Sequence, residues 1–281
     1  MKIREISTAE LDYVARLCVD PWMPPTWRKA MAPAMDVRKE WLTAMMHKGL
    51  KVLVAIEKAE ALNPRSMRSR KIRELMVNDE IPQGLIEYVP IEFALEPVRG
   101  RNSLFINCVW VLPRFWHKRI AESLLTKFIA DARAYGGASV LAYEGDKWFG
   151  FFPYMPVSFF KKYGFREVDR DQTRVLLHLD LSACEPPELI RSKAKVAAKG
   201  DRLVLDAFYN SQCPWSRWMV DKIKRHTKKY GAIVNEINTD DRRVIEKRGI
   251  SRGVYINGKP AIKRMASWKE VDAIVQQEFQ H

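Results

Sequence analysis

Apolar residues along the first two thirds of the chain recur at spacings that alternate between those of strands and those of helices. Residues 103–112 (SLFINCVWVL) are almost continuously apolar, which is typical of a strand buried on both faces. Beyond a short loop, apolar residues at 124, 125, 128, 129 and 132 form one helical stripe, which ends at Gly136 and Gly137. The same reasoning predicts further strands at residues 3–6, 50–58, 83–94, 138–146 and 173–181, and further helices at residues 8–19, 36–48 and 157–165.

Three stretches fit neither spacing. PWMPPTW (21–27) holds three prolines in seven residues, so we expect irregular structure there. Residues 59–82 are polar and rich in arginine, which indicates a mobile or helical excursion on the surface. Residues 184–200 contain two prolines followed by KAKVAAKG, and this composition predicts a linker.

The pattern starts again after that linker. The apolar strand LVLDAFYN (203–210) leads into a helix that starts near Pro214, followed by the strand AIVNEIN and the capped helix TDDRRVIEKRG. Asn257 and Gly258 predict a hairpin turn, and a closing helix follows Ser267. The order β-α-β-α-β-β-α is thioredoxin-like. The sequence therefore predicts two α/β domains, at residues 1–183 and 201–281, joined by residues 184–200.

The charge of the chain indicates which partners these domains could bind. The chain has 281 residues and a net charge of +14, and from residue 184 onward 20 Lys and Arg face 12 Asp and Glu. Basic and acidic residues are interspersed, so we interpret most of this charge as a solvated surface. A basic stripe on the helix after Pro214 could contact RNA phosphates, but no recognised nucleic-acid motif accompanies it, so we do not expect nucleic acid as a partner.

The cysteines and the apolar runs indicate the cellular compartment in which we expect the protein. The four cysteines are scattered, with no C-x-x-C pair and no spacing of metal ligands, so we expect a reducing cytoplasm and no metal. The N-terminus MKIREISTAE lacks the apolar run of a secretory signal. The longest apolar stretch is far too short to span a bilayer, so we expect no membrane insertion.

The most informative stretch is the strand, proline, loop and helix of residues 109–125. A helix N-terminus with unpaired N–H groups is a general anion site. Followed by a strand and SFFKKYGFREV, this layout resembles the GNAT acyltransferase superfamily, a mixed β-sheet domain flanked by helices. The resemblance implies that acetyl-CoA is the acyl donor, with its pantetheine arm on the strand and its pyrophosphate on the loop. The residues that it assigns to the cofactor are Val109, Trp110, Val111, Trp116, His117, Lys118, Arg119, Ile120 and Ala121.

The loop departs from the superfamily's usual pattern. That pattern has Arg or Gln, two residues, Gly, one residue, and then Gly or Ala, and these positions are Trp116, Arg119 and Ala121 here. Only Ala121 conforms. A residue other than glycine can still donate its backbone N–H, and Lys118 and Arg119 could add charge-assisted bonds to phosphate. We therefore expect this loop to bind the pyrophosphate.

A closer resemblance covers nearly the whole chain. The segments CVWV (108–111), DKW (146–148) and FFKKYGFREVD (159–169) are similar to YoaP-type members of the superfamily. Those members carry a smaller thioredoxin-like domain with a Q-C-P-aromatic loop and a Y-x-N-G-K hairpin, which correspond here to QCPW (212–215) and YINGK (255–259).

Acyl transfer to an amine needs a base, a polarised carbonyl and an acid for the departing thiolate. The position at which the family often has a tyrosine acid is Phe160 here, so we predict Tyr163 as the substitute, with Tyr154 as the second choice. Glu87 and Glu144 are candidate bases, although surface carboxylates would look the same. Cys108 could take an acyl group, or act only as a small buried hydrophobe. The apolar runs at 21–27 and 148–156 could wall the acceptor pocket or belong to the core.

A second candidate site lies at the start of the helix after Pro214. Cys213 occupies the place of a redox-active thiol, where a helix N-terminus stabilises the thiolate. Ser216 replaces the resolving cysteine, so disulfide exchange cannot run within this loop. Monothiol chemistry and a role in binding both stay open.

Together these features predict an N-acetyltransferase that moves an acyl group from acetyl-CoA to a small-molecule or peptide amine. The alternative is a binding or monothiol redox protein that acts through Cys213, with a degenerate acyltransferase scaffold. The oligomeric state is not encoded in any pattern that we find.

Overall fold

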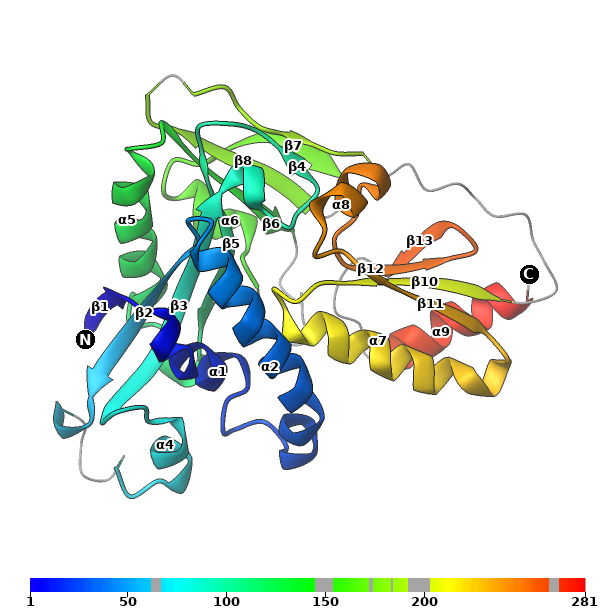
Figure 1. Cartoon of the computed structure of the whole chain (residues 1–281), viewed down its shortest axis with the longest axis horizontal. Helices are drawn as coiled ribbons and strands as arrows, with labels where there is room; N and C mark the ends of the chain where they lie inside the picture. The colour runs from blue at the N-terminus through cyan, green and yellow to red at the C-terminus, as the bar shows by residue number, and fades with distance from the viewer. Residues whose placement is uncertain are drawn as a thin grey trace.

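The computed structural model describes residues 1–61, 67–144, 154–171, 174–182, 184–191, 203–262 and 268–280. Its larger unit is built on a seven-stranded sheet with the order β1-β2-β3-β5-β6-β8-β7 (Figure 1). All neighbours in this sheet are antiparallel except β5 and β6, which are parallel. Its strands are β1 (Lys2–Glu5), β2 (Lys51–Lys58), β3 (Glu80–Pro90), β5 (Leu104–Val111), β6 (Gly137–Tyr143), β7 (Arg166–Asp171) and β8 (Arg174–Asp180).

Helices cover both faces of this sheet. α1 and α2 lie on one side of the central strands and α5 lies on the other (Figure 1). The core between these layers is continuous and apolar, and includes Tyr88, Phe105 and Phe128, which are fully buried. The helices of this unit are α1 (Asp12–Cys18), α2 (Pro25–Met46), α4 (Arg70–Leu75), α5 (Ile120–Ala132) and α6 (Val157–Lys161). Short 3-10 turns are η1 (Thr8–Glu10), η2 (Ala59–Ala61), η3 (Ile91–Phe93) and η4 (Pro113–Phe115).

Two irregularities in β5 shape the middle of the sheet. Glu87 pairs with Cys108 but Tyr88 pairs with Ile106, so Asn107 is an extra residue that forms a β-bulge. β5 pairs with β6 only as far as Ile106, opposite Val140, although both strands continue beyond this point. The two strands therefore splay apart, and the edge of β5 from residue 107 onward has no strand partner on that side.

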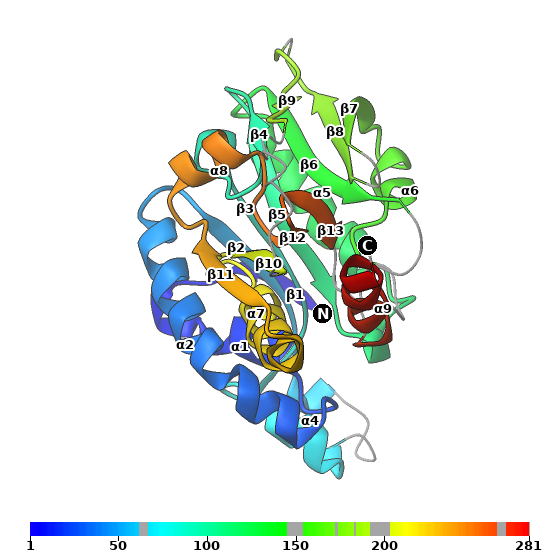
Figure 2. The same cartoon turned by 90° about the vertical axis from the view of Figure 1, so that its right-hand side faces the viewer.

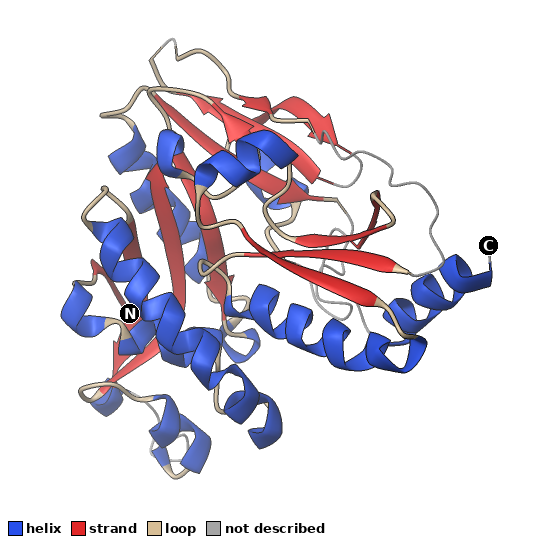
Figure 3. Cartoon of the chain, turned by 45° about the vertical axis from the view of Figure 1, so that its right-hand side comes forward, coloured by secondary structure: helices blue, strands red, loops and turns tan. Residues whose placement is uncertain are grey.

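The smaller unit has a four-stranded sheet with the order β11-β10-β12-β13, in which β10 and β11 are parallel and the other pairs antiparallel. α7 and α9 lie on one face of this sheet and α8 lies on the other (Figures 1 and 3). The elements are β10 (Val204–Tyr209), α7 (Pro214–Thr227), η5 (Lys228–Tyr230), β11 (Ile233–Asn238), α8 (Arg242–Arg248), β12 (Gly253–Ile256), β13 (Lys259–Ile262) and α9 (Trp268–Gln280). This order, with the turn at Asn257 and Gly258, is the one that the sequence predicts.

The two units pack directly against each other, as the side view in Figure 2 shows. Trp27 of α2 contacts Trp215 and Trp218 of α7, with ring centroids 6.4 Å and 5.2 Å apart. Met31 of α2 is fully buried within the core of the smaller unit. Burial of one such side chain stabilises by roughly 1.5–3 kcal/mol. α2 therefore belongs to the packing of both units.

Polar contacts close a second part of this interface. Ser251 Oγ donates to Glu96 Oε2 (2.7 Å), and Arg252 pairs with the other oxygen of the same carboxylate. Gln212 Nε2 donates to the carbonyl of Asn107 in the β5 bulge (3.3 Å). Arg242 donates to the carbonyls of Ala94 and Val98, within the connection between β3 and β5. Because Glu96 and Gln212 are buried, these contacts fix the orientation of the smaller unit.

The prediction of irregular structure over residues 21–27 is partly wrong. α2 starts at Pro25, earlier than the predicted start at residue 36, and it also contains Pro33. Proline is tolerated in a first helical turn because the N–H that it lacks would have no helical partner there. Packing of Trp27 and Met31 against α7 then stabilises the turns before Pro33.

Some elements were not predicted. β7 is mostly exposed and polar, so it carries no apolar alternation. β4 (Val98–Arg99) and β9 (Glu188–Leu189) form a two-residue pair, which places β9 inside the predicted linker. The polar segment of residues 59–82 contains the helix α4, which agrees with the prediction of a helical excursion there. The rest of the linker (192–200) and part of the aromatic run (148–153) lie outside the described residues.

Candidate functional site

A cavity of about 410 Å³ lies where β5 splays from β6. It is bounded by the free edge of β5, by the loop before α5 and the first turn of that helix, and by residues 154–163. Every residue predicted to bind the cofactor lines it except Lys118. Lys118 instead places its ammonium over the ring of Phe115, 5.4 Å from the centroid. We call this space the cofactor cavity.

The loop before α5 adopts a conformation that usually needs glycine. Arg119, the residue preceding α5, has φ 56° and ψ 23°, and His117 has φ 63°. Arg119 stands at the position where the family pattern has glycine, and a left-handed conformation costs about 1–2 kcal/mol for a residue with a side chain. Trp116 Nε1 donates to the Val111 carbonyl (2.8 Å), which ties the loop to the end of β5.

This geometry suits a phosphate group. The first N–H groups of α5 have no partner within the helix, and they point along its axis toward the loop. The helix dipole adds partial positive charge at the same place. The loop therefore presents donors to an anion without glycine, because its left-handed residues reproduce the turn that glycine would make.

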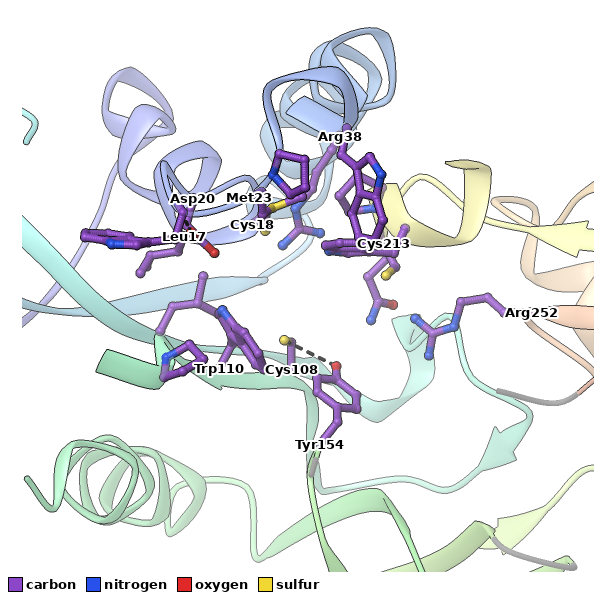
Figure 4. Close-up of a pocket in the computed structure, with 18 residues that line it drawn as sticks. Leu17, Cys18, Asp20, Met23, Arg38, Cys108, Trp110, Tyr154, Cys213 and Arg252 are labelled. Carbon is purple, nitrogen blue, oxygen red and sulfur yellow. Dashed lines mark hydrogen bonds between the residues drawn. The ribbon is translucent and has the colours of Figure 1, made fainter. Parts of the chain in front are cut away.

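A second cavity of about 280 Å³ lies between the two units. Its walls are mainly apolar. Its polar groups come from α1, the connection between α1 and α2, α2 and β5, and from the loops before α7 and before β12 in the smaller unit (Figure 4). Apolar lining comes from Trp22, Met23, Trp27, Leu85, Trp110 and Trp215, and polar lining from Asp20, Arg38, Cys108, Gln212, Cys213 and Arg252. We call this space the acceptor cavity, after the role that we propose for it below.

The two cavities meet at Trp110 and Tyr154, which line both of them. The Tyr154 hydroxyl donates to Cys108 Sγ (3.3 Å; dashed in Figure 4). Burial, followed by the nearby Cys108 and Cys213 thiols, raises the pKa of Tyr154 well above 10. This hydroxyl therefore stays protonated at neutral pH, at the point where the contents of the two cavities would touch.

A buried ion pair holds one wall of the acceptor cavity. Arg38 Nη2 lies 2.7 Å from Glu87 Oε2, and both side chains are almost completely buried (2% and 0% exposed). Asn107 Nδ2 donates to the other oxygen of Glu87 (3.3 Å). Burial disfavours the charge of Arg38, but Glu87 and the thiols of Cys18, Cys108 and Cys213 together outweigh it, and the pKa of Arg38 is raised. The guanidinium is thus charged and fixed in direction.

The structure separates the predicted catalytic residues. Tyr163 lines the cofactor cavity only. Glu144 is exposed and pairs with Arg170 (2.7 Å), and it lines neither cavity. Glu87 lies behind Arg38 and contributes no surface to either cavity. Cys108 lines the acceptor cavity, and burial, then Glu87, raises the pKa of its thiol, which disfavours the thiolate that a nucleophile needs.

Cys213 and Ser216 differ in their surroundings. Cys213 directly precedes α7 and lines the acceptor cavity. The Ser216 hydroxyl donates to the carbonyls of Asn210 (3.0 Å) and Cys213 (2.7 Å), and accepts from the Asn210 N–H (3.3 Å). Ser216 therefore stabilises the loop that carries Cys213. Cys18, Cys108 and Cys213 all line this one cavity.

Sequence reasoning overlooked several of these groups. Asp20, Arg38 and Arg252 were not predicted as site residues. One signal was available for Arg38: it lies on the buried stripe of α2, between Met35 and Leu42. A charged residue at such a position requires a buried partner.

The described residues contain no group of three or more His, Cys, Asp or Glu side chains placed to hold a metal ion. None of the described helices is long and apolar enough to cross a membrane.

Comparison with known proteins adds one relative in sequence. No family model matches the chain. The chain is 26% identical over 216 residues to the uncharacterized N-acetyltransferase YoaP of Bacillus subtilis strain 168, and the similar region covers 76% of this chain and 75% of YoaP. A region of that length cannot fit within residues 1–183, so the similarity extends into the smaller unit.

Solved structures similar to this chain are more distant. They include the PaiA N-acetyltransferase of Thermoplasma acidophilum in complex with coenzyme A, which is 16% identical with a TM-score of 0.41 and covers 64% of this chain and 98% of its own. An N-acetyltransferase of Staphylococcus aureus Mu50 is 14% identical with a TM-score of 0.39, and covers 64% of this chain and 98% of its own.

Proposed function

We propose that this protein is a GNAT-type N-acetyltransferase that transfers an acetyl group from acetyl-CoA to an amine. The observation that carries the proposal is the junction of two cavities at Trp110 and Tyr154, beside the splayed edge of β5. Direct transfer requires donor and acceptor to meet at one point, and this junction provides it. The similarity to YoaP, itself described as an N-acetyltransferase, supports the same reaction.

The residues of the cofactor cavity fit the donor. The edge of β5 from residue 107 onward offers backbone groups that β6 does not use, so Val109 to Val111 can pair with the amides of a pantetheine arm. The first N–H groups of α5 and the Arg119 guanidinium face the place for the pyrophosphate. When bound, acetyl-CoA supplies an activated acyl group as a thioester.

Tyr154 is the proposed acid. As the amine attacks the thioester carbonyl, a C–N bond forms and the C–S bond breaks, and the leaving sulfur takes up a proton. The Tyr154 hydroxyl is protonated, partly buried and at the junction, as that step requires. Of the two predicted bases, Glu87 is the nearer to the acceptor cavity, because its register partner Cys108 and its ion-pair partner Arg38 both line it.

The smaller unit is proposed to be a thioredoxin-like domain at residues 201–281 that completes the acceptor site, with the acyltransferase domain at 1–183. Its sheet order and strand directions support this assignment. Gln212, Cys213 and Arg252 all come from this unit and line the acceptor cavity. The free cysteines fit a reducing compartment such as the cytoplasm.

Calorimetric titration with acetyl-CoA and with CoA tests the proposed function, at moderate salt to suppress nonspecific phosphate binding. We expect one-to-one binding in the micromolar range, followed by release of the CoA thiol when an amine acceptor is added. If neither compound binds, the acyltransferase assignment fails, and Cys213 becomes the group to study.

A further inference from the structure

The acceptor cavity contains buried polar atoms that the protein leaves without partners. Among the described residues, Arg38 Nε and Nη1 have no hydrogen-bond partner although both atoms are buried. Gln212 Oε1 is likewise buried and unpartnered, while Gln212 Nε2 is engaged with the Asn107 carbonyl. Arg38 and Gln212 are 2% and 3% exposed, and both line the cavity.

These unpartnered atoms demand complementary groups. A buried donor or acceptor without a partner is destabilising, and more so when it carries charge. The Cys18 thiol lies within hydrogen-bonding reach of the Arg38 side chain, and the Cys108 and Cys213 thiols lie within its electrostatic reach, but thiols are weak acceptors. A ligand that brings a strong acceptor to Arg38 and an N–H to Gln212 would satisfy both residues at once.

A second guanidinium faces the same space. Arg252 enters the cavity from the smaller unit, whereas Arg38 enters it from α2 (Figure 4). Arg252 lies within electrostatic reach of Tyr154, and Tyr154 lines both cavities, so Arg252 lies near their junction. Two guanidinium groups near the reacting end of the cavity favour an acceptor whose anionic group is close to its amine.

The charge balance limits how anionic this ligand can be. Glu87 neutralises Arg38 and Glu96 neutralises Arg252, while Asp20 adds a carboxylate at the other side of the cavity (Figure 4). A phosphate or other polyanion would leave excess negative charge in this mainly apolar space, which is unfavourable. A zwitterion adds a positive and a negative group without changing the total.

We infer that the acceptor cavity binds a free α-amino acid with a large apolar side chain, whose carboxylate contacts Arg38 and Arg252 and whose amine donates to Gln212 Oε1. The apolar side chain lies among the tryptophans of the wall. At about 280 Å³ the cavity is close to the lower end of the size of ligand sites, as such a small ligand requires. This inference rests on the proposed function, because it names the acceptor of that reaction.

Binding of matched compounds tests the inference without any turnover. Titrations with phenylalanine, phenethylamine and 3-phenylpropionate, each with and without saturating CoA, compare the zwitterion with forms that lack one charged group. We expect phenylalanine to bind at least about tenfold more tightly than either, since loss of one charge-assisted contact costs about 1.4 kcal/mol or more. Equal binding of phenylalanine and phenethylamine overturns the inference, as does no binding of phenylalanine.

Variants locate the effect in the cavity. In Arg252→Met, we expect the preference for phenylalanine over phenethylamine to fall below about threefold. Gln212→Leu should weaken phenylalanine and phenethylamine alike and leave 3-phenylpropionate unchanged. Arg243→Met is the matched control, because Arg243 is exposed on α8 and pairs with Asp241. Circular dichroism verifies that each variant is folded. If the preference survives in Arg252→Met, the carboxylate contact is wrong.

The titration with CoA distinguishes failure of the proposed function from failure of this inference. CoA binding without phenylalanine binding leaves the acetyltransferase standing and rejects this acceptor class. Selective phenylalanine binding without CoA binding rejects the acetyltransferase and retains the amino-acid site.

Discussion

The cofactor cavity and the acceptor cavity meet at Trp110 and Tyr154, but they are built in different ways. The first uses backbone groups: the free edge of β5 and the N–H groups at the start of α5. The second uses side chains from both units, including two arginines, each held by its own glutamate.

This difference determines how each site tolerates substitution. Backbone groups remain when a side chain changes. The loop before α5 therefore still forms its turn with Arg119 at the position where the family pattern has glycine. The acceptor cavity depends on buried charges, and removal of one partner leaves the other uncompensated. We therefore expect substitutions to affect the acceptor cavity more than the cofactor cavity, and four predictions test that contrast.

We expect the largest effect when the negative charge of Glu87, which lies behind Arg38, is removed. Glu87→Gln keeps the shape but leaves Arg38 buried without its counter-ion, so we expect a fall of about 3–5 kcal/mol in the free energy of unfolding. Urea denaturation measures it. The control is Glu144→Gln at the exposed pair with Arg170, for which we expect no measurable change in the midpoint. A change in Glu87→Gln as small as in the control would mean that the pair does not hold the cavity.

The next effect concerns the proposed acid. Tyr154→Phe removes the protonated hydroxyl at the junction, so kcat should fall about 100-fold or more while acetyl-CoA affinity stays the same. Because the pKa of Tyr154 lies well above 10, the wild-type rate should not decline through ionisation of this group below pH 10. Tyr163→Phe gives the comparison. A larger loss in Tyr163→Phe than in Tyr154→Phe returns the acid role to Tyr163.

Smaller effects are expected at the cofactor loop. Removal of both charges in Lys118→Ala/Arg119→Ala should weaken CoA binding severalfold, about fivefold or more, and reduce its dependence on salt. Arg119→Gly should be more stable than Arg119→Ala by about 1 kcal/mol, because glycine adopts φ 56° without strain. Calorimetry and urea denaturation measure the two quantities. Unchanged CoA affinity in the double variant would restrict the site to backbone donors.

The smallest effect is a pH dependence at Asp20. Burial raises the pKa of this carboxyl, although the N–H groups of Trp22 and Met23 partly offset the shift. Between the unfolded pKa and the raised folded pKa, the folded protein binds more protons than the unfolded chain, so its stability decreases as pH rises through that window. Asp20→Asn should remove this slope in urea titrations at acidic pH. An unchanged slope would assign the dependence to another group.

The junction of the two cavities was only partly predictable. The resemblance directed attention to Tyr163, which lies on the expected helix segment, yet Tyr154 is the tyrosine that lines both cavities. The reason is the approach of residues 154–156 to β6, where the Tyr143 N–H donates to the Met155 carbonyl (3.1 Å). That contact spans a stretch of chain with no regular spacing, so no sequence period reports it.

The amino-acid sequence by itself determined the features whose causes are local. The buried strand at 103–112, the loop and helix that follow it, the hairpin at Asn257 and the element order of the smaller unit all follow from spacing, turn residues and helix starts. The residues of the cofactor cavity come from two short segments, so the prediction named nearly all of its loop.

Only the tertiary structure decided the acceptor cavity. Its polar groups come from residues as distant in sequence as Asp20 and Arg252. The ion pair that holds its wall joins Arg38 and Glu87, which are 49 positions apart. The early start of α2 depends on contacts of Trp27 and Met31 with the smaller unit. Such features depend on which surfaces are buried together, and burial between distant segments leaves no regular spacing in the sequence.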